Sequence, residues 1–317
     1  MFAKKKRHRM KRSKLTITIL ITIGSFIAGY KGKPFIQQSI YLPLRTFLNL
    51  TPVSDSPLTV RDYTPTGCPK SAITIATFGQ SNSANHVDKK YSGKIPKTLY
   101  QYDWKSRKCY HYKEPLLGTD GFSGSIITYT ALALSKEKQL PVIVAPFGES
   151  GSSILSWAYG SLSLRHNLVL DRIKQDGLSP KVFFWHQGES DSHTYDLKAL
   201  SSNEYFKTSD YGGLTKEQYS NSLQIILDKT KSRFPNSYFG IAKASICGNR
   251  PRNEQIRESQ SESALRNKQG FVSADTDKFT GNANRPDGCH FSSDAAERIG
   301  LEYFDSYTAK ESARQSP

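Results

Sequence analysis

The stretch Ala72–Asn85, AITIATFGQSNSAN, places a serine two residues beyond a glycine at the end of an apolar run. The β-branched and aromatic residues of this run predict a buried strand. Gly79 permits a tight turn directly after it, so that Ser81 would stand at the carboxyl end of the strand. A Gly-x-Ser turn alone is most often only a turn, and the rest of the chain has to decide between a turn and a nucleophile.

Apolar β-type runs recur along the chain and alternate with helix-like stretches. The runs are 72–78, 141–147, 182–186 and 238–244, with weaker ones at 98–104 and 270–274, and the helical stretches are 123–138, 162–176, 215–233, 252–267 and 293–308. Continuous apolar strands separated by helices predict an α/β fold in which a parallel sheet is covered on both faces. Ligands of such sheets bind beyond the carboxyl ends of the strands.

Small, polar and potentially catalytic residues follow several of these runs. The segments are GQSN (79–82), GESGSS (148–153), QGESD (187–191) and SICGN (245–249), and DGCH (287–290) precedes the last helical stretch. Because the carboxyl ends of parallel strands lie at one edge of a sheet, we expect these segments to meet there.

Acyl transfer through a serine needs a hydroxyl, a base, a group that orients the base, and donors for the oxyanion. Ser81 is the candidate nucleophile, His290 the base and Asp287 its orienting carboxylate. The candidate oxyanion donors are the backbone N–H groups of Ser81 and Gly151 and the side-chain amide of Gln187. Asp287 and His290 are three residues apart, so a single turn can join them.

Other polar residues beside these segments allow more than one interpretation. Glu189 and Asp191 could order the loop, bind a sugar or compete with Asp287, and roles that support the loop or the catalytic groups from behind are favoured. Asn82 is expected to stabilise the turn or the rim of the site. His186, Glu189 and His193 lack the spacing of a zinc-binding HExxH helix, so no metal site is expected.

The first 67 residues differ in character from the rest. Residues 1–14 carry eight Lys and Arg and no acid, and so supply half of the formal net charge of +16. An uncharged apolar run follows and spans roughly 24 Å as a helix, slightly short of a ~30 Å hydrocarbon core. We expect a basic cytoplasmic tail (1–14), a signal anchor or transmembrane helix (15–31), a stalk (32–67), a catalytic domain (68–308) and a C-terminal tail (309–317). Cleavage of the apolar segment as an export signal is the alternative, and no nucleic-acid partner is expected.

All four cysteines follow the apolar segment, and an even number in an exported domain predicts two disulfides with three possible pairings. Cys247 follows a predicted strand and Cys289 adjoins His290, so a bridge between them would brace the histidine loop. Cys68 and Cys109 would then pair by elimination.

The segments GQSN, SGSSILSW, WHQGESD and DGCHFS together resemble the blocks of the SGNH (GDSL-like) hydrolases, more closely their sialate O-acetylesterase and carbohydrate acetylesterase branch. EPLLGTDGFSGS (114–125) is also similar to bacterial members of that branch. The resemblance covers about 68–305. It implies a three-layer, flavodoxin-like α/β/α fold, hydrolysis of an acetyl or other short acyl ester on a carbohydrate, and no metal or organic cofactor. The second block departs from the usual Gly-Gly-Thr in reading Ser150-Gly151-Ser152.

The resulting hypothesis is a serine esterase that acts on acetylated glycans outside the cytoplasm, either tethered to the membrane or secreted after signal cleavage. Two alternatives remain open at this point. One is an envelope glycan O-acyltransferase that uses the same serine chemistry, and the other is an inactive carbohydrate-binding module on this scaffold.

Overall fold

The computed structural model describes residues 62–192, 213–248 and 250–315. Its eight-stranded sheet has the order β1-β4-β3-β5-β2-β6-β7-β8. The strands are β1 (Pro65–Thr66), β2 (Ile73–Gly79), β3 (Leu99–Asp103), β4 (Lys108–His111), β5 (Val142–Gly148), β6 (Pro180–His186), β7 (Tyr238–Lys243) and β8 (Gly270–Asp275). The helices are α4 (Ile126–Lys138), α5 (Ile154–Ala158), α6 (Ser161–Gln175), α7 (Lys216–Lys231), α8 (Glu254–Arg266) and α9 (Ser293–Gln315), with short 3₁₀ turns η3 (Ser81–Ser83) and η5 (Thr276–Lys278).

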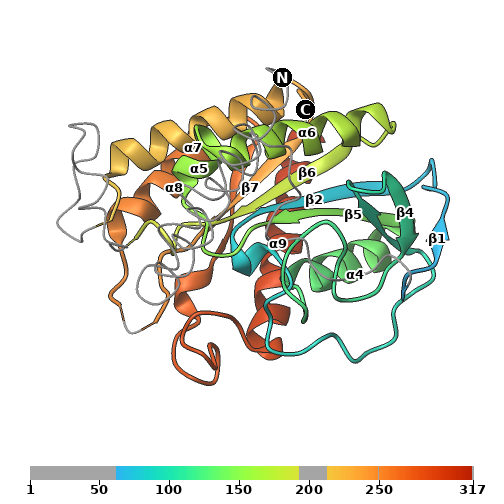
Figure 1. The fold of residues 1–317 in the computed structure, drawn as a ribbon, viewed down its shortest axis with the longest axis horizontal. Helices are drawn as coiled ribbons and strands as arrows, with labels where there is room; N and C mark the ends of the chain where they lie inside the picture. The colour runs from blue at the N-terminus through green and yellow to red at the C-terminus, as the bar shows by residue number, and fades with distance from the viewer. Residues whose placement is uncertain (1–61, 193–212, 249, 316–317) are drawn as a thin grey trace, which may run out of the picture. The chain divides into compact units, whose positions relative to one another are not determined.

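The sheet is the middle of three layers, as expected for an α/β/α fold. Helices α5, α6, α7 and α8 cover one face, and α4 and α9 cover the other (Figure 1). Alternation along single strands builds both cores: in β6, Phe183 and Trp185 join the core under α6 and α7, whereas Val182 and Phe184 join the core under α4 and α9. Side chains of this size each stabilise the fold by about 1.5–3 kcal/mol when they leave water.

The sheet is mixed, and the expectation of a purely parallel one is wrong at one edge. β4 runs antiparallel to β3, and β1 runs antiparallel to β4. A tight turn between β3 and β4 causes the reversal, and Arg107 in that turn has a positive φ of 59°. The six other strands are parallel in their pairings with one another.

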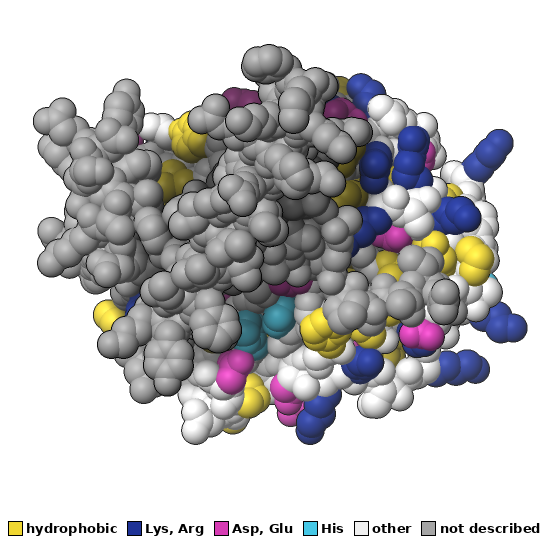
Figure 2. Space-filling model, viewed as in Figure 1, with side chains coloured by type: hydrophobic (Ala, Val, Ile, Leu, Met, Phe, Trp, Pro, Cys, Tyr) yellow, Lys and Arg dark blue, Asp and Glu magenta, His cyan; other side chains and the backbone are white. Residues whose placement is uncertain are grey.

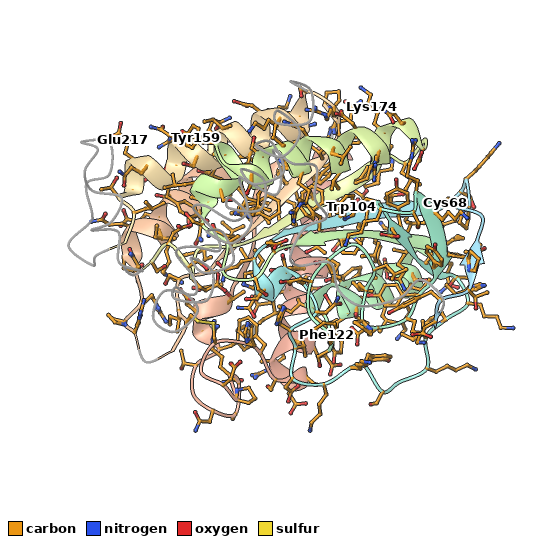
Figure 3. The ribbon with its side chains drawn as sticks, in the orientation of Figure 1. Cys68, Trp104, Phe122, Tyr159, Lys174 and Glu217 are labelled. Atoms are coloured by element: carbon orange, nitrogen blue, oxygen red, sulfur yellow. A yellow bond between two sulfur atoms is a disulfide. The ribbon has the colours of Figure 1, made fainter. Side chains whose placement is uncertain are left out.

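The antiparallel edge is held by one of two disulfides. Cys68, labelled in Figure 3, is bonded to Cys109 of β4, and their Cα atoms are 5.2 Å apart. The second disulfide joins Cys247 and Cys289. Disulfide formation was predicted from the even cysteine count, and the structure contains both bridges.

Charged side chains of both signs share the described surface. In the view of Figure 2, Lys and Arg side chains (dark blue) lie mainly toward the end that carries β3 and β4, with Asp and Glu among them. No described helix is long and apolar enough to cross a membrane. The basic tail 1–14, the expected anchor 15–31 and the expected stalk up to residue 61 lie outside the described residues.

Two boundaries of the expected catalytic domain differ in the structure. β1 begins at Pro65, within the expected stalk, because its short strand pairs with β4. α9 runs to Gln315, beyond the expected domain end at 308 and into the expected tail. Helix α5 lies in a Gly/Ser-rich stretch where no helix was expected.

The topology leaves one favoured place for chemistry. β2 lies between β5 on one side and β6 on the other, so the chain connections diverge on either side of its carboxyl end. Ligands of open α/β sheets bind at such a switch point. Gly79 ends β2 at this place, and Ser81 follows in η3.

Candidate active site

The turn that carries Ser81 depends on a close approach between two strand ends. Gly79 has φ = 139°, and a Cβ atom added there would lie 2.1 Å from the carbonyl oxygen of His186. The side chain of Gln80 crosses the gap between the strands and accepts a hydrogen bond from Ser190 N–H at 3.1 Å. Ser83 Oγ donates to Gln80 O at 2.7 Å and closes the turn. This packing fixes Ser81 at the edge of the sheet with 4% of its surface exposed.

The Asp287–His290 loop has the geometry of a base and its orienting carboxylate. Asp287 Oδ2 lies 2.6 Å from His290 Nδ1. Asp287 Oδ1 accepts hydrogen bonds from the backbone N–H groups of Cys289 at 2.8 Å and His290 at 2.7 Å. Partial burial raises the pKa of Asp287, but these hydrogen bonds outweigh it and bring the pKa to about 2. The carboxylate therefore stays ionised and leaves Nε2 of His290 as the nitrogen for proton transfer.

A buried arginine and a disulfide brace this loop. Arg285 is 1% exposed and donates to the carbonyl groups of Ile246 at 3.0 Å and Cys289 at 2.5 Å. Its guanidinium carbon lies 4.0 Å from the ring centroid of Phe291. The Cys247–Cys289 bridge ties the same two segments covalently. Residues on both sides of His290 are thus fixed, which limits the positions open to the imidazole.

Contacts between neighbouring residues bring Ser81 and His290 to the same place. Asn82 Nδ2 donates to Cys289 O at 3.4 Å, so the residue after the serine touches the residue before the histidine. Asp88 N–H donates to Phe291 O at 3.0 Å. The hydrogen bonds of the described residues do not include one between Ser81 Oγ and His290 Nε2.

Glu189 supports the serine turn from inside the protein. It is 3% exposed, and its Oε1 accepts a hydrogen bond from Asn82 Nδ2 at 2.8 Å. Burial raises the pKa of Glu189, but the adjacent His186 and Arg285 outweigh it and bring the pKa to about 2. His186 Nε2 lies 3.2 Å from Glu189 Oε1, and its Nδ1 lies 2.8 Å from Tyr303 Oη. An ionised, buried Glu189 therefore fixes Asn82 next to Ser81.

The candidate oxyanion side lies between the ends of β5 and β6. Gly151 has φ = 64°, and a Cβ atom added there would meet no atom within 4 Å. Glycine is therefore favoured at this position by the left-handed backbone conformation and not by a lack of space. Gln187 is fully buried, and its amide donates to Ser152 O at 3.1 Å and to Asp191 Oδ2 at 2.6 Å. Both amide hydrogens are thus engaged, and a direct role for Gln187 at the oxyanion requires one of these bonds to break.

Asp191 is a buried support of the same loop. Its Oδ2 also accepts a hydrogen bond from Ile154 N–H at the start of α5, at 2.7 Å. Burial raises the pKa of Asp191 to about 6. The carboxylate therefore connects the end of β6 to the segment that carries Gly151.

His86 and Asp120 lie at the site, and neither was expected to be a functional residue from the sequence. The ring of His86 stacks on that of His290, with centroids 4.9 Å apart and an angle of 24° between the planes. His86 Nε2 lies 3.0 Å from Asp120 Oδ1 and 2.7 Å from Ser150 Oγ. Ser150 N–H donates to Asp120 Oδ2 at 2.8 Å. The signal available in the sequence was the Asp-Gly pair 120–121 in the stretch that resembles bacterial relatives.

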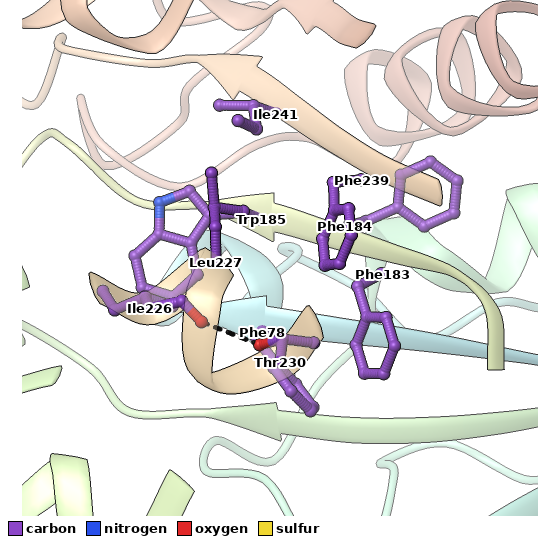
Figure 4. A pocket seen from close by; sticks show the side chains of 9 residues that line it. All are labelled: Phe78, Phe183, Phe184, Trp185, Ile226, Leu227, Thr230, Phe239 and Ile241. Atoms are coloured by element: carbon purple, nitrogen blue, oxygen red, sulfur yellow. Dashed lines mark hydrogen bonds between the residues drawn. The ribbon is translucent and has the colours of Figure 1, made fainter. Parts of the chain in front are cut away.

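A small apolar pocket lies elsewhere, between the sheet and α7. Phe78, Trp185 and Phe183 are among its lining residues (Figure 4). Its hydroxyl, Thr230 Oγ1, donates to Ile226 O at 2.9 Å and is already satisfied. This pocket is a packing defect of the core and not a candidate substrate site.

Comparisons with known proteins concern the family and the fold of the chain. A family model described as "Carbohydrate esterase, sialic acid-specific acetylesterase" matches residues 75–309. No curated protein sequence matches the chain significantly.

The chain is similar to a number of solved structures, among them the following two. A protein from Arabidopsis thaliana is 17% identical with a TM-score of 0.57, over 76% of this chain and 99% of that one. A carbohydrate acetylesterase from Xanthomonas citri is 14% identical with a TM-score of 0.49, over 75% of this chain and 56% of that one.

Proposed function

The chain belongs to the sialic acid-specific acetylesterase family of carbohydrate esterases, and from this premise we propose that Ser81, His290 and Asp287 hydrolyse acetyl esters of sugar hydroxyls through an acetyl-enzyme. The observation that carries the proposal is the Asp287–His290 pair, joined at 2.6 Å, in a loop that contacts the residue after Ser81. A serine esterase needs an imidazole that is oriented in this way beside its nucleophile.

In the first half of the reaction, Ser81 Oγ attacks the acetyl carbonyl carbon and His290 Nε2 takes the serine proton. The backbone N–H groups of Ser81 and Gly151 donate to the oxyanion that develops on the carbonyl oxygen. The carbon–oxygen bond to the sugar then breaks, and His290 returns the proton to the sugar oxygen. In the second half, water attacks the acetyl-enzyme with His290 as base, and acetate leaves.

Ser150 is a competing nucleophile, because its hydroxyl also contacts a histidine that contacts an aspartate. Its geometry does not suit relay of a proton: Ser150 Oγ and Asp120 Oδ1 both contact the same nitrogen, Nε2 of His86. In a working triad, the serine and the carboxylate use opposite nitrogens of the ring. Ser81 is therefore the proposed nucleophile.

We also propose that the catalytic domain acts outside the cytoplasm, held by residues 15–31 as a membrane anchor. The two disulfides support the first part, because disulfides persist in oxidising compartments. The basic and apolar sequence of residues 1–31 supports the second. Fractionation of expressing cells with and without residues 1–31 tests it: loss of membrane association on deletion is expected, and unchanged association contradicts it.

The direct test of the chemistry is Ser81→Ala, assayed by acetate release from O-acetylated N-acetylneuraminic acid. We expect kcat to fall by ~10⁴ or more with an unchanged circular dichroism spectrum. Ser232→Ala is the matched control, because Ser232 ends α7 near the start of β7, at the opposite edge of the sheet. Retained turnover in Ser81→Ala would refute the assignment.

A further inference from the structure

Phe122 is an exposed aromatic side chain in a loop that is hydrogen-bonded to the segment following the serine turn. It is 55% exposed and lies in the loop before α4 (Figure 3). Of the other large exposed apolar side chains, Leu164, Leu168, Leu265 and Leu301 lie on helices α6, α8 and α9. Leu140 and Tyr159 lie just beyond the carboxyl ends of α4 and α5. Single apolar residues on outer helix faces need no explanation, whereas a loop phenylalanine beside catalytic groups does.

Backbone hydrogen bonds fix the loop on both sides of Phe122. Asn85 N–H donates to Asp120 O at 3.0 Å, and Ser123 N–H donates to Asn85 O at 3.1 Å. Val87 N–H donates to Gly124 O, also at 3.0 Å. Each of these bonds joins the loop to the segment that directly follows the serine turn. The exposure of Phe122 is therefore imposed by the fold.

The loop reaches the catalytic histidine through one intermediate ring. A Cβ atom added to Gly121 would lie 2.7 Å from Nε2 of His86, so the residue before Phe122 is packed against that imidazole. The ring of His86 in turn stacks on His290. In Figure 2, histidine side chains (cyan) lie at the surface beside an apolar patch, at the place where Figure 3 labels Phe122.

Polar groups that suit a sugar surround this position. Side chains of His86 and Asp120 are 25% and 14% exposed. Their mutual contact and the contact with Ser150 use Nε2 of His86, which leaves Nδ1 for another partner. A pyranose ring presents an apolar C–H face and a rim of hydroxyls, so it needs an aromatic surface flanked by donors and acceptors. Binding sites commonly combine an apolar surface with a few placed polar groups in this way.

We propose that Phe122, with His86 and Asp120, forms the subsite for the sugar half of the ester: the pyranose ring stacks on Phe122 and its hydroxyls bind to the two polar side chains. This inference rests on the proposed function and adds a determinant of substrate choice. The subsite lies on the His290 side of the nucleophile, where the leaving alcohol must receive its proton.

The test compares Phe122→Ala with wild type on two substrates, a mono-O-acetylated methyl glycoside and ethyl acetate, by acetate release. Loss of the stack should lower kcat/KM for the glycoside about 10-fold, and should lower the ratio of glycoside to ethyl acetate by the same factor. Phe122→Trp keeps an aromatic face and should restore the ratio to within about 3-fold. Leu265→Ala removes another exposed apolar side chain, on α8, and should change kcat/KM for neither substrate.

An unchanged ratio in Phe122→Ala, or an equal loss on both substrates, overturns the subsite and leaves the proposed function standing. Failure of the wild type to release acetate from either substrate overturns both. Binding gives a second readout without turnover: in the Ser81→Ala background, Phe122→Ala should weaken the glycoside about 10-fold in an NMR titration. Equal affinities there also contradict the subsite.

Discussion

Replacement of Asp287 by asparagine tests whether catalysis requires the orientation of the base His290 by a carboxylate, because the variant keeps His290 itself. In the structure, Asp287 Oδ2 accepts the Nδ1 proton of His290, and Oδ1 accepts two backbone N–H groups. Asparagine is nearly isosteric, and its oxygen can keep the two backbone bonds. Its NH₂ group would then face Nδ1 and donate to it. The proton of neutral His290 would be driven to Nε2, which is the atom that must take a proton from Ser81.

The expected loss follows from this reversal of the tautomer. We expect kcat for acetate release to fall by ~10⁴ at neutral pH, with KM and the melting temperature nearly unchanged. The side chain of Asp287 is 56% exposed, so solvent screens its charge and little of the loss should come from electrostatic attraction alone.

The assay is steady-state acetate release at pH 7.5, with thermal unfolding of the same samples. Asp294→Asn is the matched control, because Asp294 is an exposed acidic residue in the first turn of α9, and its turnover should stay within twofold of wild type. If Asp287→Asn keeps a third or more of the wild-type kcat, the reasoning from the tautomer is wrong and another acid must orient His290.

Three further outcomes are expected. Gln187→Ala should lower both the melting temperature and kcat, because the buried acceptors Ser152 O and Asp191 Oδ2 lose their donor, which costs about 1–3 kcal/mol of stability. A loss of kcat without a loss of stability would instead favour direct donation from Gln187 to the oxyanion. Replacing Cys247 and Cys289 by serine opens a loop of 42 residues, which in the chain-entropy model should lower the free energy of unfolding in urea by about 4 kcal/mol, and kcat should fall as well. If neither the free energy of unfolding nor kcat changes, the disulfide does not hold the histidine loop in place. Burial, together with Lys229 and Arg233, lowers the pKa of the fully buried His166 to about 3, so below about pH 6.5 only the unfolded chain takes up a proton at this residue and the folded state loses stability. Between pH 7.5 and 4.5, the free energy of unfolding of His166→Phe should therefore rise by about 3 kcal/mol relative to that of wild type, and parallel pH profiles of the two proteins would contradict this.

Strands and helices that bury continuous apolar surface could be predicted from the sequence. Runs such as 141–147 and 182–185 are apolar throughout because both of their faces are covered, and they form most of β5 and β6. β4 escaped prediction because its four residues, KCYH, are exposed at both ends and owe their strand form to pairing with β3. α5 escaped because glycine and serine dominate the turn before it, and a buried contact from Asp191 fixes its first N–H.

Sequence spacing also limited what could be said of the site. Asp287 and His290 are near in sequence, so their contact could be expected from one turn of chain. His86 and His290 are far apart, and no local pattern predicts that their rings stack. Arg285 carries a charge, and charged residues are expected at the surface, yet it is buried because carbonyl groups of several loops accept its hydrogen bonds.

The identity of the nucleophile is tested most directly by covalent labelling with diethyl p-nitrophenyl phosphate, which phosphorylates activated serines, followed by tryptic digestion and mass spectrometry. Cleavage after Lys70 and Lys89 places Ser81 in peptide 71–89, whereas cleavage after Lys138 and Arg165 places Ser150 in peptide 139–165. We expect a single diethyl phosphate on Ser81 that appears as activity is lost, and no label in Ser81→Ala. A label on Ser150, or equal labelling of wild type and Ser81→Ala, would contradict this assignment.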